Sequence, residues 1–162
     1  MGVITKAQIA SAIVAELSVI TDFKQAMDVD EIKESLQRPD LPAFLVYPKS
    51  WQSDAGSTVT QITFGGGGTA VQPKLFTFMV EVHATIRHQI GQDMARAIDI
   101  TDQVDTLLDA QVSSSQRPRF GLTDSAGNAA IKSFGWSAEH ALQQYGGIET
   151  VGAQYMLEFE VF

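Results

Sequence analysis

Two long segments of the chain alternate strictly between apolar and polar residues. In the first, 75–87, the apolar positions are Phe76, Phe78, Val80, Val82, Ala84 and Ile86. In the second, 151–162, they are Val151, Ala153, Tyr155, Leu157, Phe159 and Val161. A period of two is typical of a β-strand with one face on a core and the other toward water or a partner. Both segments are therefore predicted to be long strands.

Three shorter segments also have the composition of strands. The run 43–47 is apolar and lies between Pro42 and Pro48, which leaves no room for a helix. Segment 58–64 is rich in β-branched residues, and 131–138 contains two aromatic side chains. Each is predicted to be a short strand.

Apolar residues at helical spacing predict two helices. The first covers 5–20, where Thr5 and Gln8 form a capping-box pair and one stripe contains Ile9, Ile13, Leu17 and Ile20. The second covers 93–110 and carries acidic residues on its outer side. Residues 30–36 can form a short helix before the next proline stops it.

The connections are rich in glycine and small polar residues. Segments 58–64 and 75–87 are expected to pair as a hairpin whose mobile tip contains Gly65, Gly66, Gly67 and Gly68. We expect a loop at 112–130 and a connection at 139–150 with a Gly146–Gly147 turn. Grouped strands with two helices predict one α+β domain spanning 1–162. Its sheet is expected to be mostly antiparallel, flanked by helices on one face and extended by a long β-hairpin arm.

Composition narrows the function classes. The chain has 162 residues, 44% of them hydrophobic, so it can bury a core. Its net charge of −8 argues against tight binding of nucleic acid, because such binding needs clustered cationic side chains. Charged residues make up only 19%, and a surface of small polar groups favours protein–protein contact. We find no membrane-spanning run and no secretory signal, and expect the protein to stay where it is made.

The residues that carry chemistry do not form a reactive cluster. The absence of cysteine excludes disulfides and thiolate nucleophiles. Of the three histidines, His83 and His140 are interpreted as surface residues, and none has the spacing of a metal site. The four glycines lack the Lys-Ser or Lys-Thr pair of a phosphate-binding loop. We therefore predict no catalytic residue, no cofactor and no metal.

Two charged groups are candidates for contact with other molecules. Arg117 and Arg119 form the one compact basic patch, suited to a backbone phosphate or to a salt bridge with a neighbouring acidic subunit. On the second predicted helix, Asp99, Asp102 and Asp105 form an acidic side.

The element order and several segments resemble the tail terminator, or tail-completion, proteins of long-tailed bacteriophages. The residues that carry the resemblance are PAFLVYP, LFTFMVEVHATIRH, GQDMARAIDITDQVDTLLDAQ and YGGIETVGAQYMLEFEVF. The resemblance implies an α+β fold and a hexameric ring on the finished tail tube. It also implies a location in the virion neck, reached from the host cytoplasm during assembly. Such a ring ends tube polymerisation, contacts the tube protein on one face and the head connector on the other, and lets DNA pass unheld.

Two hypotheses and two alternative functions accompany this resemblance. Asp99, Asp102 and Asp105 are hypothesised to line the bore, and Gly65–Gly68 to form a docking arm. The first alternative is another neck, connector or tube-like ring subunit. The second, of a different class, is a small-ligand-binding or enzymatic α+β domain.

Overall fold

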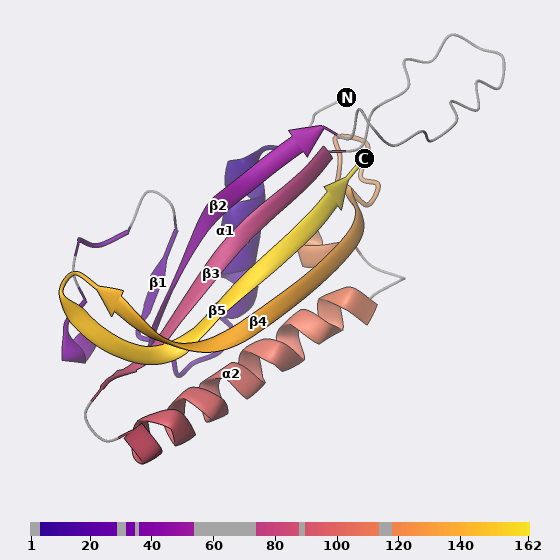
Figure 1. Cartoon of the computed structure of the whole chain (residues 1–162). Helices are drawn as coiled ribbons and strands as arrows, with labels where there is room; N and C mark the ends of the chain where they lie inside the picture. The colour runs from indigo at the N-terminus through magenta and orange to yellow at the C-terminus, as the bar shows by residue number, and fades with distance from the viewer. Residues whose placement is uncertain (1–3, 29–31, 35, 54–73, 88–89, 114–117) are drawn as a thin grey trace, which may run out of the picture.

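A computed structural model describes residues 4–28, 32–34, 36–53, 74–87, 90–113 and 118–162. The elements in chain order are α1 (Lys6–Leu17), β1 (Gln25–Met27), η1 (Arg38–Asp40), β2 (Ala43–Ser53), β3 (Lys74–Ile86), α2 (Ile90–Ser113), η2 (Arg119–Gly121), β4 (Ile131–Tyr145) and β5 (Ile148–Val161) (Figure 1). The strands form one sheet in the order β1-β2-β3-β5-β4, in which β1 and β2 are parallel and every other pair is antiparallel. The prediction of an α+β fold with a mostly antiparallel sheet is confirmed.

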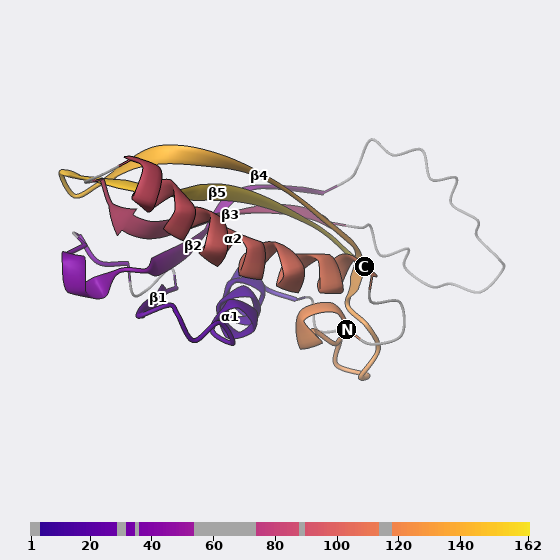
Figure 2. The same ribbon diagram turned by 90° about the horizontal axis from the view of Figure 1, so that it is seen from below.

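The main core lies between the helices and the sheet. Figure 2 shows α1 and α2 drawn on the same side of the sheet. Buried residues of both helices join one cluster with inward side chains of β2, β3 and β5, such as Phe44, Phe78 and Leu157. Phe78 and Phe159 meet edge to face with ring centroids 5.9 Å apart. The alternation predicted for β5, and for β3 as far as Ala84, holds on this face, because these apolar positions are buried there. Ile86 follows a register shift between His83 and Thr85 and packs against a separate cluster.

Helix α1 begins as its sequence predicts. Thr5 Oγ1 accepts a hydrogen bond from the Gln8 backbone at 3.2 Å, and Gln8 Oε1 accepts one from the Thr5 backbone at 2.8 Å. This reciprocal pair is the expected capping box. The helix ends at Leu17 rather than Ile20, although Ile20 is still buried.

The predicted hairpin partner of β3 is wrong. β3 lies between β2 and β5, so its two edges are already occupied. The strand beginning at Ala43 does not stop at Pro48 but continues to Ser53, with a register shift between Pro48 and Ser50. A bulge accommodates proline because the ladder is already interrupted there. The predicted strand at 58–64 and the glycines Gly65–Gly68 lie outside the described residues.

The segment 139–150, expected as a connection, is instead the tip of a long hairpin. β4 continues to Tyr145 and β5 starts at Ile148. The two linking residues, Gly146 and Gly147, have φ of 55° and 81°. Two consecutive positive φ values are what a tight hairpin turn of the primed type requires, and glycine adopts them without strain. His140 therefore lies on a strand and not in a loop.

A second, smaller core lies on the opposite face of the sheet. Leu45 alternates with the inward Phe44 and packs in a separate cluster with Met27, Leu36, Leu41 and Ala43. The short helix expected at 30–36 is not found in its described residues, 32–34 and 36. A three-residue strand, β1, precedes this segment instead.

The loop expected at 112–130 has more structure than its composition indicates. α2 continues to Ser113, and η2 follows within the segment. A bridge joins Thr123 to Ala129, and Asp124 Oδ1 accepts backbone hydrogen bonds from Ala126 and Asn128, each at 2.8 Å. An aspartate that bonds backbone groups just ahead of it is a common means of closing a turn.

Candidate subunit-interaction site

The outer edge of β4 is open. Within the described part of the chain, β4 pairs with β5 alone and forms the far edge of the sheet (Figure 1). Its register runs without a shift from Ser133 to Tyr145. Residues 137–140 are exposed on both faces, and Leu142 keeps 53% of its surface exposed.

Natural proteins usually protect such an edge. Lysine, proline and β-bulges are the common devices that prevent an edge strand from pairing with another chain. Segment 133–145 contains neither lysine nor proline, and its pairing with β5 has no bulge. The open edge of β4, from Ser133 to Tyr145, is thus suited to accept a strand of another chain.

Hydrogen bonds from two aromatic side chains hold α2 against the sheet beneath this edge, and one of these residues, Tyr155, also lies 3.3 Å from the Thr101 carbonyl. The Trp136 indole of β4 donates to Asp109 Oδ1 at 3.1 Å, and the Tyr155 hydroxyl of β5 donates to Asp105 Oδ1 at 2.6 Å. The Trp136 and Tyr155 rings lie 5.7 Å apart. Burial of Tyr155, helped by the Asp105 carboxylate, raises the pKa of the tyrosine hydroxyl. The tyrosine therefore stays a hydrogen-bond donor.

These bonds give the three aspartates of the predicted acidic side of α2 different roles. Asp99 and Asp102 are exposed, whereas Asp105 is partly buried and engaged with Tyr155. Asp99 and Asp102 keep the charge and exposure that a bore-lining role requires. Asp105 has a structural role in the packing of α2.

The described half of the predicted basic patch is engaged within the chain. Arg119 donates to the carbonyls of Gln111 at 3.1 Å, Lys132 at 3.2 Å and Val112 at 3.4 Å. A guanidinium that bonds the last carbonyls of a helix satisfies acceptors that the helix leaves open. Arg119 thus joins the end of α2 to the start of β4, and Arg117 lies outside the described residues.

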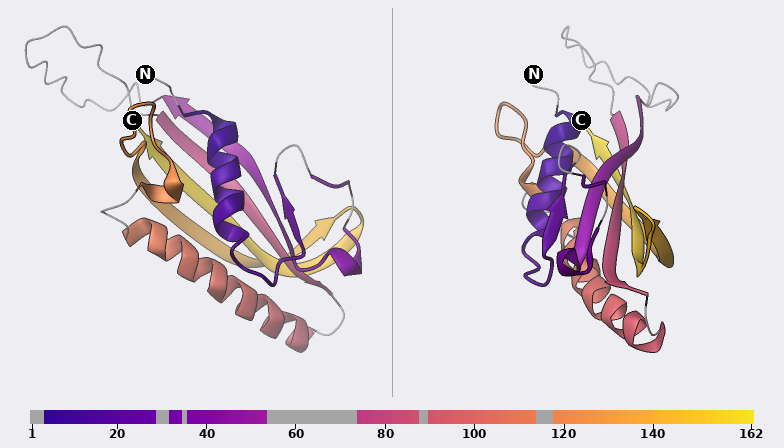
Figure 3. Two further views of the ribbon diagram at one scale, coloured as in Figure 1. Left: turned by 180° about the vertical axis from the view of Figure 1, so that it is seen from behind. Right: turned by 90° about the vertical axis from the view of Figure 1, so that its left-hand side faces the viewer.

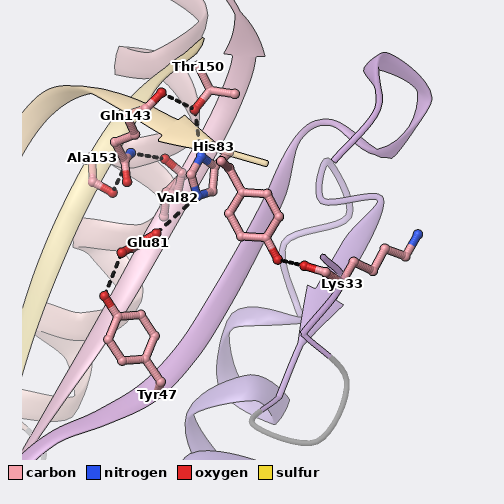
Figure 4. A network of polar contacts seen from close by, with 9 residues as sticks. Lys33, Tyr47, Glu81, Val82, His83, Gln143, Thr150 and Ala153 are labelled. Carbon is pink, nitrogen blue, oxygen red and sulfur yellow. Dashed lines mark hydrogen bonds and ion pairs between the residues drawn. The ribbon is translucent and has the colours of Figure 1, made fainter. Parts of the chain in front are cut away.

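His83 is buried, so its interpretation as a surface residue is wrong. Its ring has no exposed surface, its Nδ1 lies 2.6 Å from Thr150 Oγ1, and its Nε2 lies 3.4 Å from Glu81 Oε2 (Figure 4). Tyr145 covers the ring, with centroids 5.4 Å apart, and donates its hydroxyl to the Lys33 carbonyl. The alternation of β3 places His83 on the outward face, as predicted. That face is covered here by residues distant in sequence.

Glu81 connects this histidine to the neighbouring strand. The Tyr47 hydroxyl of β2 donates to Glu81 Oε1 at 2.6 Å. The His83 ring and the Tyr47 hydroxyl lower the pKa of Glu81, although burial acts in the opposite direction. Burial and the same bond raise the pKa of Tyr47 above its usual range. The carboxylate is therefore the favoured form of Glu81 in the folded protein.

Gln143 extends the same network across β5. Its side-chain nitrogen donates to the Val82 carbonyl at 3.0 Å and lies 3.5 Å from the Ala153 carbonyl. It passes over Gly152, where an added Cβ would lie 1.7 Å from the Val82 oxygen. Only glycine fits at this position. The network joins β2, β3, β5 and β4 across the outward face. We therefore assign these polar residues a structural role in holding the strands together at this end of the sheet.

The remaining tests for chemistry concern the described residues only. Among them, no three histidine, aspartate or glutamate side chains are grouped so as to hold a metal ion. No helix in the same set is long and apolar enough to cross a bilayer. Comparison with protein-family models and with curated protein sequences gave no match.

Proposed function

We propose that this chain is a structural subunit of a ring at the head-proximal end of a bacteriophage tail tube. There it ends tube polymerisation and joins the tail to the head connector. The observation that carries the proposal is the open edge of β4, a long backbone ladder that contains no lysine, proline or bulge from Ser133 to Tyr145. The α+β fold agrees with the fold that the sequence resemblance implies.

The charge on β4 favours a ring over a two-fold dimer. If two copies paired their 133–145 segments antiparallel and in full, residue 139 of each would lie opposite the other. Both are Glu139, which is exposed, and like charges directly opposite destabilise a strand pair. The β4 edge is therefore expected to meet a different surface of its neighbour. Repeated contacts between unlike surfaces form rings when the rotation closes.

The acidic residues of α2 fit the passage of DNA. Asp99 and Asp102 are exposed and carry negative charge on the outer side of the helix. A negative bore repels the phosphate backbone and lets it pass without being held. In this proposal the tube protein and the head connector contact the two flat faces of the ring.

The experiment is a measurement of mass in solution, followed by microscopy. Size-exclusion chromatography with light scattering is expected to give a ring of about six copies, and negative-stain images are expected to show the ring on tail tubes. Leu142→Lys places a charge on the open edge and is expected to shift the protein to monomers. Val19→Lys is the matched control, because Val19 is exposed to 66% in the connection after α1 and should leave the ring intact.

Other outcomes separate the alternatives. A ring that binds tail parts other than the tube end would identify a different neck or tube-like subunit. A monomer at all concentrations, or a Leu142→Lys protein with unchanged mass, would refute the proposed role of β4. A monomer that retains a small ligand through purification would favour the ligand-binding or enzymatic class.

A further inference from the structure

A groove of about 660 Å³ lies between the connection that follows α1 and the first turns of α2. Figure 3 shows these two segments on the same side of the sheet, beside the end of β3. Leu41, Ala84 and Ile100 supply apolar surface in it. Its volume is in the range of sites that bind a ligand or a peptide segment.

Three cations line this groove: Lys24, Arg38 and Arg96. All three side chains are exposed, and none forms a hydrogen bond or an ion pair within the described part of the chain. Other cations are paired, since Lys33, Arg87 and Lys132 each contact a carboxylate within 3.1 Å. Three of the cations without a carboxylate partner are thus gathered at one place, on three different segments of the chain.

The groove also contains three acidic residues, and two of them already have stabilising interactions within the chain. Asp22 accepts a hydrogen bond from Gln103 at 2.9 Å. Asp93 is buried in the first turn of α2, where the helix dipole stabilises its charge. Asp99 is the third and is exposed. The groove is therefore close to neutral in a chain of net charge −8, and its free groups are mainly cationic.

The same chain exposes free carboxylates on β4 and β5, away from the groove. Glu139 on β4 and Glu158 on β5 are exposed and have no partner among the described residues. The register pairs Glu139 with Gln154, four residues from Glu158, so the two carboxylates lie on one face about 13 Å apart along the strand. The groove is a different surface, because it is lined by the end of β3, the first turns of α2 and the segments before β1 and β2, and by no described residue of β4 or β5.

We propose that the groove binds the acidic β4–β5 face of a second copy of this chain. This inference rests on the proposed ring and specifies which surfaces meet in it. In this contact the groove cations of one subunit, Lys24, Arg38 and Arg96, form ion pairs with Glu139 and Glu158 of the next subunit. Each subunit therefore covers part of the β4–β5 face of its neighbour. The two surfaces share no residue, as the unlike contacts of a closed ring require.

The test uses matched reversals of charge in the full chain. Lys24→Glu with Arg96→Glu is expected to weaken association about tenfold or more, because exposed ion pairs are replaced by repulsion. Glu139→Lys with Glu158→Lys is expected to do the same. An equal mixture of the two variants should restore rings in which they alternate, since every groove then meets the opposite charge. Sedimentation velocity at several salt concentrations measures each case.

A control separates this contact from net charge. Lys74→Glu reverses a charge at an exposed site outside the groove, and its pairing with Val161 places it on the face opposite to Glu158; it should leave the ring unchanged. Equal weakening by this control, or no restoration in the mixture, would overturn the inference. If the groove variant forms normal rings but no longer joins the tail tube, the occupant is another protein and a second copy is the wrong assignment. A monomeric wild-type protein would refute the ring itself, and this inference with it.

Discussion

Gly152 offers a sharp test of how the sheet is held together. Changing it to alanine adds a Cβ that would lie 1.7 Å from the Val82 oxygen and 3.1 Å from the Gln143 side-chain nitrogen. The Val82 atom belongs to the backbone of β3, so the strands must separate. Forcing an extra carbon into a packed interior costs about 1–3 kcal/mol, and a lost hydrogen bond costs about 1 kcal/mol more.

We therefore expect Gly152→Ala to lower the free energy of unfolding by about 3 kcal/mol. For a domain of this size that corresponds to a fall in Tm of about 6–12 °C. Urea unfolding followed by circular dichroism measures the free energy, provided that the transition is two-state.

Gly135→Ala is the matched control. Gly135 lies in β4, and an added Cβ there has no atom within 4 Å. Alanine also reduces the freedom of the unfolded chain, so its effect should stay within about 1 kcal/mol. A Gly152→Ala protein as stable as the Gly135→Ala protein would refute the close approach of Gly152 to Val82.

Three further changes test other parts of the structure. Glu81→Gln should reduce the loss of folding stability in acid. The pKa of Glu81 is lower in the folded than in the unfolded protein, so its contribution to stability is present above the unfolded pKa and disappears as pH falls through the folded pKa. Urea midpoints that shift equally in both proteins between neutral and acid pH would contradict this. Asp99→Asn with Asp102→Asn should slow DNA ejection if this side of α2 lines the bore, and unchanged kinetics would reject that role. Deleting 65–71 should preserve the fold but abolish tail or head joining, and normal virions would exclude a docking arm.

The elements that the sequence predicts well are those with one buried face. β3, β5 and α1 bury regular stripes, so periodicity identifies them. Residues 137–140 of β4 are exposed on both faces, and the one buried residue of the second half is the polar Gln143, so the segment has no apolar alternation and its sequence predicts a connection. β1 has three residues, too few to show a period.

The candidate sites were harder to predict because their residues come from distant segments. His83 is on the polar face of β3, and its burial depends on Tyr145 and on residues near Lys33. Lys24, Arg38 and Arg96 are far apart in the sequence and meet only in the folded chain. The turn at Gly146–Gly147 was recognised, because two adjacent glycines are a local signal.

The bonds from α2 to the sheet have a mechanical consequence. Asp105 and Asp109 lie one helical turn apart and attach the C-terminal half of α2 to Tyr155 and Trp136. The helix has 24 residues and so extends about 36 Å, and Arg96 lies nine residues, about 14 Å, before Asp105. A strand that docked on β4 and shifted it would tilt α2 as a rigid rod, and the groove would move with it. In the proposed ring, occupancy of β4 would then alter the groove of the same subunit, which would favour completion of an assembly over its partial forms.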